Sequence, residues 1–209
     1  MIPKTLCRYR IKRQMLLLLA GFFFACLISP ADGTELGGQI LENTTWRLDG
    51  SPMILTGDIR IWNKSELVGT VELRIEPGVE VNLNGFSITA GDQADKDRPP
   101  NKGRIIAEDV RFFGKGNVVL ACGEENKISN CLFEDVHLLL GGKTCTNSSG
   151  KIQNITMKYS DIIIHTGKWE VMGGKLLNGT ISHQGFKTPG MSFQKEQYMN
   201  FFINLISFP

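Results

Sequence analysis

A short pattern that returns every 24 residues constrains the fold of this 209-residue chain more than any other feature of its sequence. Its copies begin at Lys127, Lys151 and Lys175, and each places an asparagine three residues after the lysine. The apolar residue that follows each lysine also has counterparts at Ile105 and Val81, at separations of 23 and 24 residues. A fixed period of this length is typical of a solenoid, in which one coil buries its apolar face only against its neighbours.

Two columns of this repeat are apolar in every coil. One contains Val81, Ile105, Ile128, Ile152 and Leu176, and the other, five residues later, contains Phe86, Val110, Phe133, Met157 and Ile181. Farther along, Leu138 and Leu140 align with Ile162 and Ile164, and these residues have the period of two that half-buried strands show. Because parallel strands stack about 4.8 Å apart, each residue is expected above its counterpart in the preceding coil. The sequence therefore predicts an all-β fold, a parallel β-helix of about 24 residues per coil.

A third column contains asparagine in the last three coils, at Asn130, Asn154 and Asn178. Asparagine tolerates the left-handed backbone of a tight turn, and stacked asparagine amides hydrogen-bond along the axis of a stack. This column predicts an asparagine ladder. N-glycosylation is the alternative, because Asn154 and Asn178 also begin sequons. Asn130 shares the column without being a sequon, which favours the ladder.

A fourth column places charges of alternating sign on one outer face, at Arg111, Glu134 and Lys158. We expect a solvated surface ladder in which each pair contributes less than about 1 kcal/mol. The alternative is a catalytic pair of an arginine and a carboxylate.

Residues 1–31 have the pattern of a signal peptide. Five basic residues and no acidic residue precede a 14-residue apolar run at residues 15–28. This run suits the core of a signal peptide and is shorter than the roughly 20 residues of a membrane span. Small residues at Ser29-Pro30-Ala31 predict cleavage after Ala31, and therefore no stable membrane span in the mature chain. A lipoprotein signal at Cys26 and an uncleaved anchor are the alternatives.

Removal of this leader changes the sign of the net charge. The whole chain has 23 basic and 21 acidic residues, so a mature chain without the five basic leader residues has 18 against 21, a net charge of −3. A general electrostatic case for nucleic-acid binding is thereby lost. The remaining length of about 178 residues suits one domain with a sizeable core.

Three motifs near the start of the repeats carry a family resemblance. They are Thr45-Trp46, Ser51-Pro52 and, most specifically, Ile75-Glu76-Pro77-Gly78-Val79-Glu80-Val81. This region resembles the N-terminal part of secreted right-handed parallel β-helix proteins, the pectate-lyase-like solenoid superfamily, although residues 62–70 depart from the pattern as an insertion. The resemblance implies fold and export, and it carries no catalytic residue over.

These observations divide the chain into four parts. Residues 1–31 form the signal peptide, 32–75 the N-terminal cap and first coils, 76–185 the β-helix coils, and 186–209 a short tail. The tail has no β pattern and some helical periodicity. It is expected either to cap the last coil or to be the remnant of a truncated, longer β-helix protein.

The spacing of the cysteines predicts one disulfide. Cys122 follows Ile105 at the same interval at which Cys145 follows Ile128, so the two cysteines share a column of the repeat. They therefore stack in adjacent coils at about 5 Å, a separation that suits a disulfide in an exported chain. Cys131 is expected to be free.

No metal site and no cofactor are predicted. Asp92, Asp95 and Asp97 offer oxygen ligands in a polar loop, but their spacing fits no calcium-loop motif. The histidines occupy three different columns. We expect Trp46 and Trp62 to cover the first coil, with stacking on sugar rings as the alternative.

Sequons mark five glycosylation candidates, in keeping with a secretory route. They begin at Asn43, Asn63, Asn147, Asn154 and Asn178.

The absence of a convergent cluster of acids, bases or nucleophiles predicts a non-catalytic protein, secreted or at the cell surface, that presents a regular face to a glycan or another cell-surface molecule. A polysaccharide lyase or glycoside hydrolase is one alternative. Glycoside hydrolysis needs two carboxylates roughly 5–9.5 Å apart, for which only Glu134 or Asp135 with Asp161 are candidates. The other alternative is the front part of a larger adhesin or enzyme.

Overall fold

The computed structural model describes residues 33–63, 69–92, 101–142, 145, 148–183, 191–192, 197–198 and 202–206. All of these belong to one unit, Gly33–Pro209. The predicted leader, the loop with Asp95 and Asp97, and the sequon at Asn147 lie outside the described residues.

The described chain consists of seventeen strands and one 3-10 turn, η1 (Leu48–Gly50). The strands are β1 (Thr34–Ile40), β2 (Thr44–Trp46), β3 (Met53–Ile61), β4 (Val71–Ile75), β5 (Glu80–Asn82), β6 (Ser87–Ala90), β7 (Gly103–Glu108), β8 (Arg111–Leu120), β9 (Asn126–Ser129), β10 (Leu132–Leu140), β11 (Ser149–Lys158), β12 (Ile162–Ile164), β13 (Lys168–Leu177), β14 (Thr180–His183), β15 (Met191–Ser192), β16 (Gln197–Tyr198) and β17 (Phe202–Ile206).

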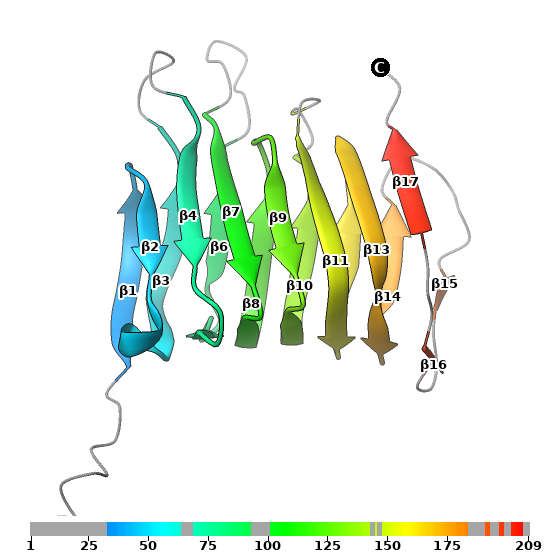
Figure 1. Ribbon diagram of the computed structural model, residues 1–209, viewed down its shortest axis with the longest axis horizontal. Helices are drawn as coiled ribbons and strands as arrows, with labels where there is room; N and C mark the ends of the chain where they lie inside the picture. Colours follow the sequence, from blue (N-terminus) through cyan, green and yellow to red (C-terminus); the bar gives the residue numbers. More distant parts are fainter. Residues whose placement is uncertain are drawn as a thin grey trace, which may run out of the picture. The chain divides into compact units, whose positions relative to one another are not determined.

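Three stacks of parallel strands form the faces of the coils. Face A consists of the starts of β1 and β3, then β5, the starts of β8 and β10, and the ends of β11 and β13. Face B consists of the ends of β1 and β3, then β6, the ends of β8 and β10, β12 and β14. Face C consists of β2, β4, β7, β9 and the starts of β11 and β13, which run side by side in Figure 1. The predicted parallel β-helix is confirmed.

Apolar side chains that alternate along the strands fill the interior. In β4, for example, Val71, Leu73 and Ile75 are buried while Arg74 is exposed, the period of two that a pleated strand requires. The core continues from Trp46 to Leu176 as one cluster. Trp46, at the end of β2, is buried in this core.

The coils differ in length, and this corrects the predicted columns. Ile128 and Ile152 pair as predicted, as do Leu138 with Ile162 and Leu140 with Ile164. Ile105 does not join the Ile128 column, because Ala107 pairs with Ile128, and Val81 lies on face A, where it pairs with Phe112. The longer connections of the early coils and a short last coil shift these partners. The column observed on face A contains Met53, Val81, Phe112, Phe133, Met157 and Leu176, at unequal intervals in the sequence.

Two of the three asparagines predicted to form a ladder, Asn130 and Asn154, do so. Asn154 donates its Nδ2 hydrogen to Oδ1 of Asn130 at 2.8 Å, and both residues have left-handed backbones, with φ of 50° and 55°. Asn178 is not the third member, because the last coil is shorter than the coil before it and brings Gly173 over Asn154. Asn178 instead comes directly after Leu177, which pairs with Lys158, and its backbone is also left-handed.

Substitution of Asn154 separates the contribution of the turn from that of the ladder. Glycine at this position loses the hydrogen bond to Asn130 but tolerates the left-handed backbone, whereas alanine also has to adopt a φ of 50° with a Cβ. We expect Asn154→Ala to lower the free energy of unfolding by about 1–2 kcal/mol more than Asn154→Gly. Urea denaturation of both variants measures the difference. Equal stability would contradict the turn geometry.

The C-terminal strands run against the direction of the coils, which corrects the expectation of a non-β tail with helical periodicity. β15 pairs antiparallel with β14 on face B, β16 with β13 on face A, and β17 with β13 on face C. The chain thus passes the three faces in reverse order. β17 covers the hydrogen-bonding edge that β13 presents on face C, visible beside β13 and β14 in Figure 1.

The predicted disulfide joins Cys122 to Cys145, with 5.6 Å between their Cα atoms. Cys131 is free, as expected, and the structure shows that it is also buried. Burial raises the pKa of the Cys131 thiol to about 11, so this thiol remains protonated at neutral pH.

Candidate functional site

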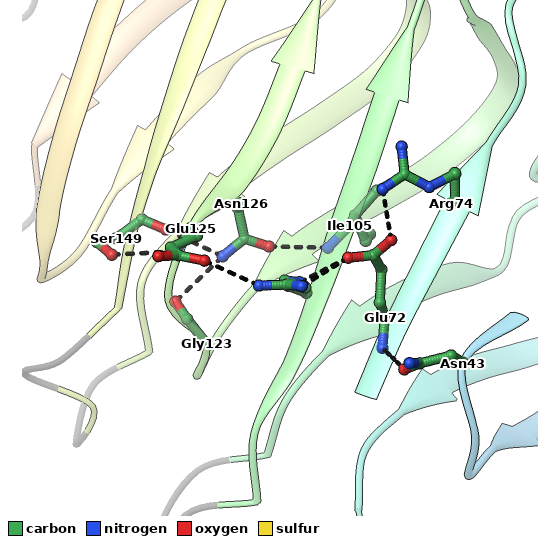
Figure 2. Close-up of polar contacts among 9 residues, drawn as sticks. Asn43, Glu72, Arg74, Ile105, Gly123, Glu125, Asn126 and Ser149 are labelled. Atoms are coloured by element: carbon green, nitrogen blue, oxygen red, sulfur yellow. Dashed lines mark hydrogen bonds and ion pairs between the residues drawn. The ribbon is translucent and has the colours of Figure 1, made fainter. Parts of the chain in front are cut away.

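A chain of charged side chains crosses the first strands of face C. Glu72 on β4 accepts hydrogen bonds from Arg74 at 2.8 Å and from Nε of Arg104 at 2.8 Å. Arg104 on β7 also donates from Nη1 to Glu125 at 2.9 Å. Figure 2 shows Arg74, Glu72 and Glu125 in this arrangement, which we call the face C network. Both oxygens of Glu72 are therefore engaged by cations.

Beside this network, the buried side chain of Asn126 fixes the backbone of three successive coils. Its Oδ1 accepts the N–H of Ile105 at 3.0 Å, and its Nδ2 donates to the carbonyls of Gly123 and Ser149, each at 3.1 Å (Figure 2). Asn126 is 1% exposed. A buried amide that satisfies backbone groups in neighbouring strands holds their register.

The face C network leads into an open groove of about 470 Å³ over β9, β11 and β13. Three triplets in successive coils line it: Glu125-Asn126-Lys127, Ser149-Gly150-Lys151 and Lys168-Trp169-Glu170. Strand pairing places their middle residues in one column and their last residues in another. We call this the face C groove.

The middle column of the face C groove is closely packed. Trp169 is 1% exposed, and its Nε1 donates to the carbonyl of Thr166 at 2.8 Å. A Cβ at Gly150 would lie 2.8 Å from the Trp169 ring and 2.5 Å from the carbonyl oxygen of Asn126. Only glycine fits between these two neighbours, so the centre of the groove is rigid and carries no protruding side chain.

The last column of the groove contains two lysines and a glutamate. Lys127 and Lys151 are partners in adjacent strands, and Nζ of Lys151 lies 3.2 Å from Oε2 of Glu170. The constant period of the sequence places Lys175, rather than Glu170, beside Lys151. Because the last coil is short, the predicted column of three lysines is interrupted by a carboxylate.

The constant period of the sequence does not place Trp169 and Lys168 in the coil next to Lys151, where the structure has them. A signal for them exists, because each triplet ends on a charged residue directly before Ile128, Ile152 or Val171. The β-branched residue marks the register, whereas the constant spacing does not.

The predicted charge ladder lies on face A and is longer than expected. Arg111 lies between Glu80, at 2.9 Å, and Glu134, at 2.6 Å, and Lys158 lies 3.0 Å from Glu134. The guanidinium of Arg111 also stacks over the Phe113 ring at 4.7 Å. The hydrogen bond from Lys158, and then that from Arg111, lower the pKa of Glu134. The bonds to Glu80 and Glu134 raise the pKa of Arg111.

A Glu134→Gln variant tests this ladder through its pH dependence. The lowered folded pKa means that the carboxylate stabilises the fold above its unfolded pKa of about 4.3 and that this contribution is lost as the pH falls through the folded pKa. We expect the variant to lose about 1 kcal/mol or less at pH 7. The difference from the unmodified chain should vanish in strong acid.

Urea midpoints at pH 7, 4 and 2.5 measure this difference. Glu108→Gln is the matched control, because Glu108 is exposed and makes no side-chain ion pair within the described residues. A loss for Glu134→Gln that persists unchanged at pH 2.5 would contradict the electrostatic origin.

The candidate catalytic carboxylates occupy separate environments. Glu134 is held by two cations on face A, and Asp135 is an exposed residue of β10 with φ of 57°, at the point where the register of this strand shifts. Asp161 accepts the N–H and the hydroxyl of Thr180, both at 2.7 Å, and its Oδ2 lies 3.2 Å from Nδ1 of His137. A carboxylate with a lowered pKa is a poor general acid, because proton donation requires a pKa near the working pH.

The sequon asparagines differ in their surroundings. Asn43 is exposed and accepts the N–H of Glu72 at 2.9 Å, whereas Asn63 is 7% exposed and donates to the carbonyl of Gly69. Nδ2 of Asn154, the atom that would carry a glycan, bonds Asn130. Asn178 is exposed.

The described residues contain neither a cluster of metal ligands nor a membrane-spanning helix. No group of three or more His, Cys, Asp or Glu side chains in this part of the chain is placed to hold a metal ion. Nor does the described part contain a helix of sufficient length and apolar character to cross a membrane.

Comparisons of the chain with protein-family models, with curated proteins and with solved structures found no match.

Proposed function

We propose that the chain is an exported, non-catalytic β-helix protein that binds a glycan on its outer surface. The observation that carries the proposal is the face C groove, which is open, polar at its rims and rigid at its centre. An open groove along the stack of coils suits an extended polymer that is bound segment by segment. An enclosed pocket would instead suit a small molecule.

The charged side chains support binding rather than catalysis. Glu72 is bonded to Arg74 and Arg104, Glu134 to Arg111 and Lys158, and Asp161 to Thr180 and His137. Glu134 and Asp161 are two of the three carboxylates that are candidates for hydrolysis. Side chains held in this way present a fixed pattern of charge to a ligand, whereas a proton-transfer pair needs one carboxyl whose pKa is raised.

Export is supported by the leader pattern and by the disulfide. A disulfide between coils persists in an oxidising compartment. The resemblance of residues 75–81 to the pectate-lyase-like solenoid superfamily agrees with the same route. We expect the intact mass of the exported chain to correspond to a polypeptide that starts at Asp32. Attached glycans at the sequons would raise this mass, and deglycosylation would remove the excess.

A glycan array tests the proposal directly. Purified mature chain should bind a restricted set of glycans, and incubation with pectin-like and alginate-like polymers should release no fragments. Fragment release, measured as new reducing or unsaturated ends, would replace this proposal with a polysaccharide lyase or hydrolase. Binding to no glycan would contradict it.

A further inference from the structure

The carboxylates of the face C groove are already neutralised by residues of the chain. Glu125 bonds Arg104 at 2.9 Å, and Glu170 bonds Lys151 at 3.2 Å. Each carboxylate of the groove is therefore paired with one cation of the chain. A ligand that enters the groove meets the charged side chains that have no such partner.

Two cations are left over. In the part of the chain that the structure describes, Lys127 and Lys168 make no side-chain hydrogen bond and no ion pair, although both line the groove. Both side chains are exposed. Their ammonium groups are compact, flexible point charges that are free to move toward a ligand.

The register places these two lysines at opposite corners of the groove. Lys127 shares a column with Lys151 and Glu170, and Lys168 precedes Glu170 by two residues on the third strand. Two strand spacings and two residue rises separate their Cα atoms by about 12 Å. The open groove of about 470 Å³, which both residues line, leaves the space into which their side chains can turn.

We infer that Lys127 and Lys168 together bind a tetrahedral oxyanion, a sulfate or phosphate group carried by a glycan. This inference rests on the proposed function and names the ligand class of the same groove. Ser149, between the two lysines, adds a hydroxyl whose Oγ accepts the N–H of Glu125 at 3.3 Å, so its hydrogen is left to donate to a ligand.

The shape of the site favours a tetrahedral group over a carboxylate. The two ammonium groups approach from opposite corners, and a tetrahedral oxyanion directs its oxygens to several sides at once. A carboxylate directs both oxygens to one side and suits a single forked partner such as arginine. A cationic ligand is disfavoured, because the groove contains three lysines and two glutamates.

The test uses four polymers that share one backbone: dextran sulfate, dextran phosphate, carboxymethyl dextran and neutral dextran. Binding of the full mature chain is measured by calorimetry at fixed ionic strength. We expect dextran sulfate or dextran phosphate to bind at least about tenfold more tightly than carboxymethyl dextran, with no binding of neutral dextran. The tighter of the first two identifies the group.

Variants then locate the site. Lys127→Gln combined with Lys168→Gln should weaken binding of the preferred polymer about tenfold or more. Lys115→Gln removes an exposed lysine of β8 that lies outside the groove, and it should change the affinity less than twofold. Displacement of the polymer by inorganic sulfate or phosphate, but not by chloride at equal ionic strength, provides a second readout on the unmodified chain.

The outcomes separate this inference from the proposed function. Unchanged binding by the double variant, or equal binding of carboxymethyl dextran, overturns the oxyanion site while glycan binding stands. Binding of only uncharged glycans on the array also overturns the oxyanion site and leaves the proposed glycan binding in place. Absence of binding to any glycan overturns the proposed function, and the oxyanion site with it.

Discussion

Replacement of Phe133 by alanine is expected to lower the free energy of unfolding by about 3–5 kcal/mol. Phe133 is fully buried on face A, and its ring stacks on Phe112 with 4.9 Å between centroids and 16° between planes. It pairs with Phe112 in the preceding coil and with Met157 in the following one. Alanine therefore leaves a cavity at the junction of three coils and loses the aromatic contact.

Guanidinium denaturation followed by far-UV circular dichroism measures this loss. Phe133→Leu is the matched control, because leucine keeps most of the apolar volume and should cost less than alanine. In a solenoid, stability depends on contacts between neighbouring coils, so we expect the alanine variant to lose cooperativity as well as stability. A loss below about 1 kcal/mol for Phe133→Ala would contradict the stacking of these coils.

Removal of the disulfide is expected to cost about 3 kcal/mol. Cys122 and Cys145 are 23 residues apart in sequence, so their bond closes a loop about one coil long. The cross-link limits the conformations of the unfolded chain, and its stabilising effect is lost in the Cys122→Ser, Cys145→Ser double variant. The same variant should no longer respond to a reducing agent.

Thermal unfolding with and without reductant checks this expectation. The unmodified chain should be destabilised by reductant to the level of the double variant. Cys131→Ala provides the control: its disulfide is intact, so it should respond to reductant as the unmodified chain does. The raised pKa of Cys131, caused mainly by burial, keeps its thiol out of disulfide exchange. A double variant as stable as the oxidised chain would be evidence against the predicted bridge.

Agreement between sequence and structure is best where the coil length matches the period of the sequence. Phe133 pairs with Met157 across one such coil, and the bonded pairs Asn130–Asn154 and Glu134–Lys158 have the same separation of 24 in the sequence. The disulfide joins cysteines with a separation of 23. In this region equal spacing in sequence means equal position in space. The predictions made there are the ones that the structure confirms.

Disagreement begins where the coil length changes. The alternation of buried and exposed residues is the same for any even shift along a strand, so it does not distinguish Ile105 from Ala107 as the residue beneath Ile128. Loops of different length between faces choose between such shifts. The constant period assigned Asn178 to the asparagine ladder, and this prediction is wrong because the last coil is short.

The sequence by itself determined three features: the stacked parallel β coils, the pair of cysteines that forms the disulfide, and the alternating charges on face A. Each of them depends only on the local period of the sequence and on one coil of regular length. Only the tertiary structure decided the face C groove. The coil between its second and third strands is shorter than the coil before it, so Glu170 instead of Lys175 meets Lys151, and Lys127 and Lys168 are left as opposite corners of one site. Coil length is set by how each loop returns the chain to the stack, and that closure depends on packing across all three faces.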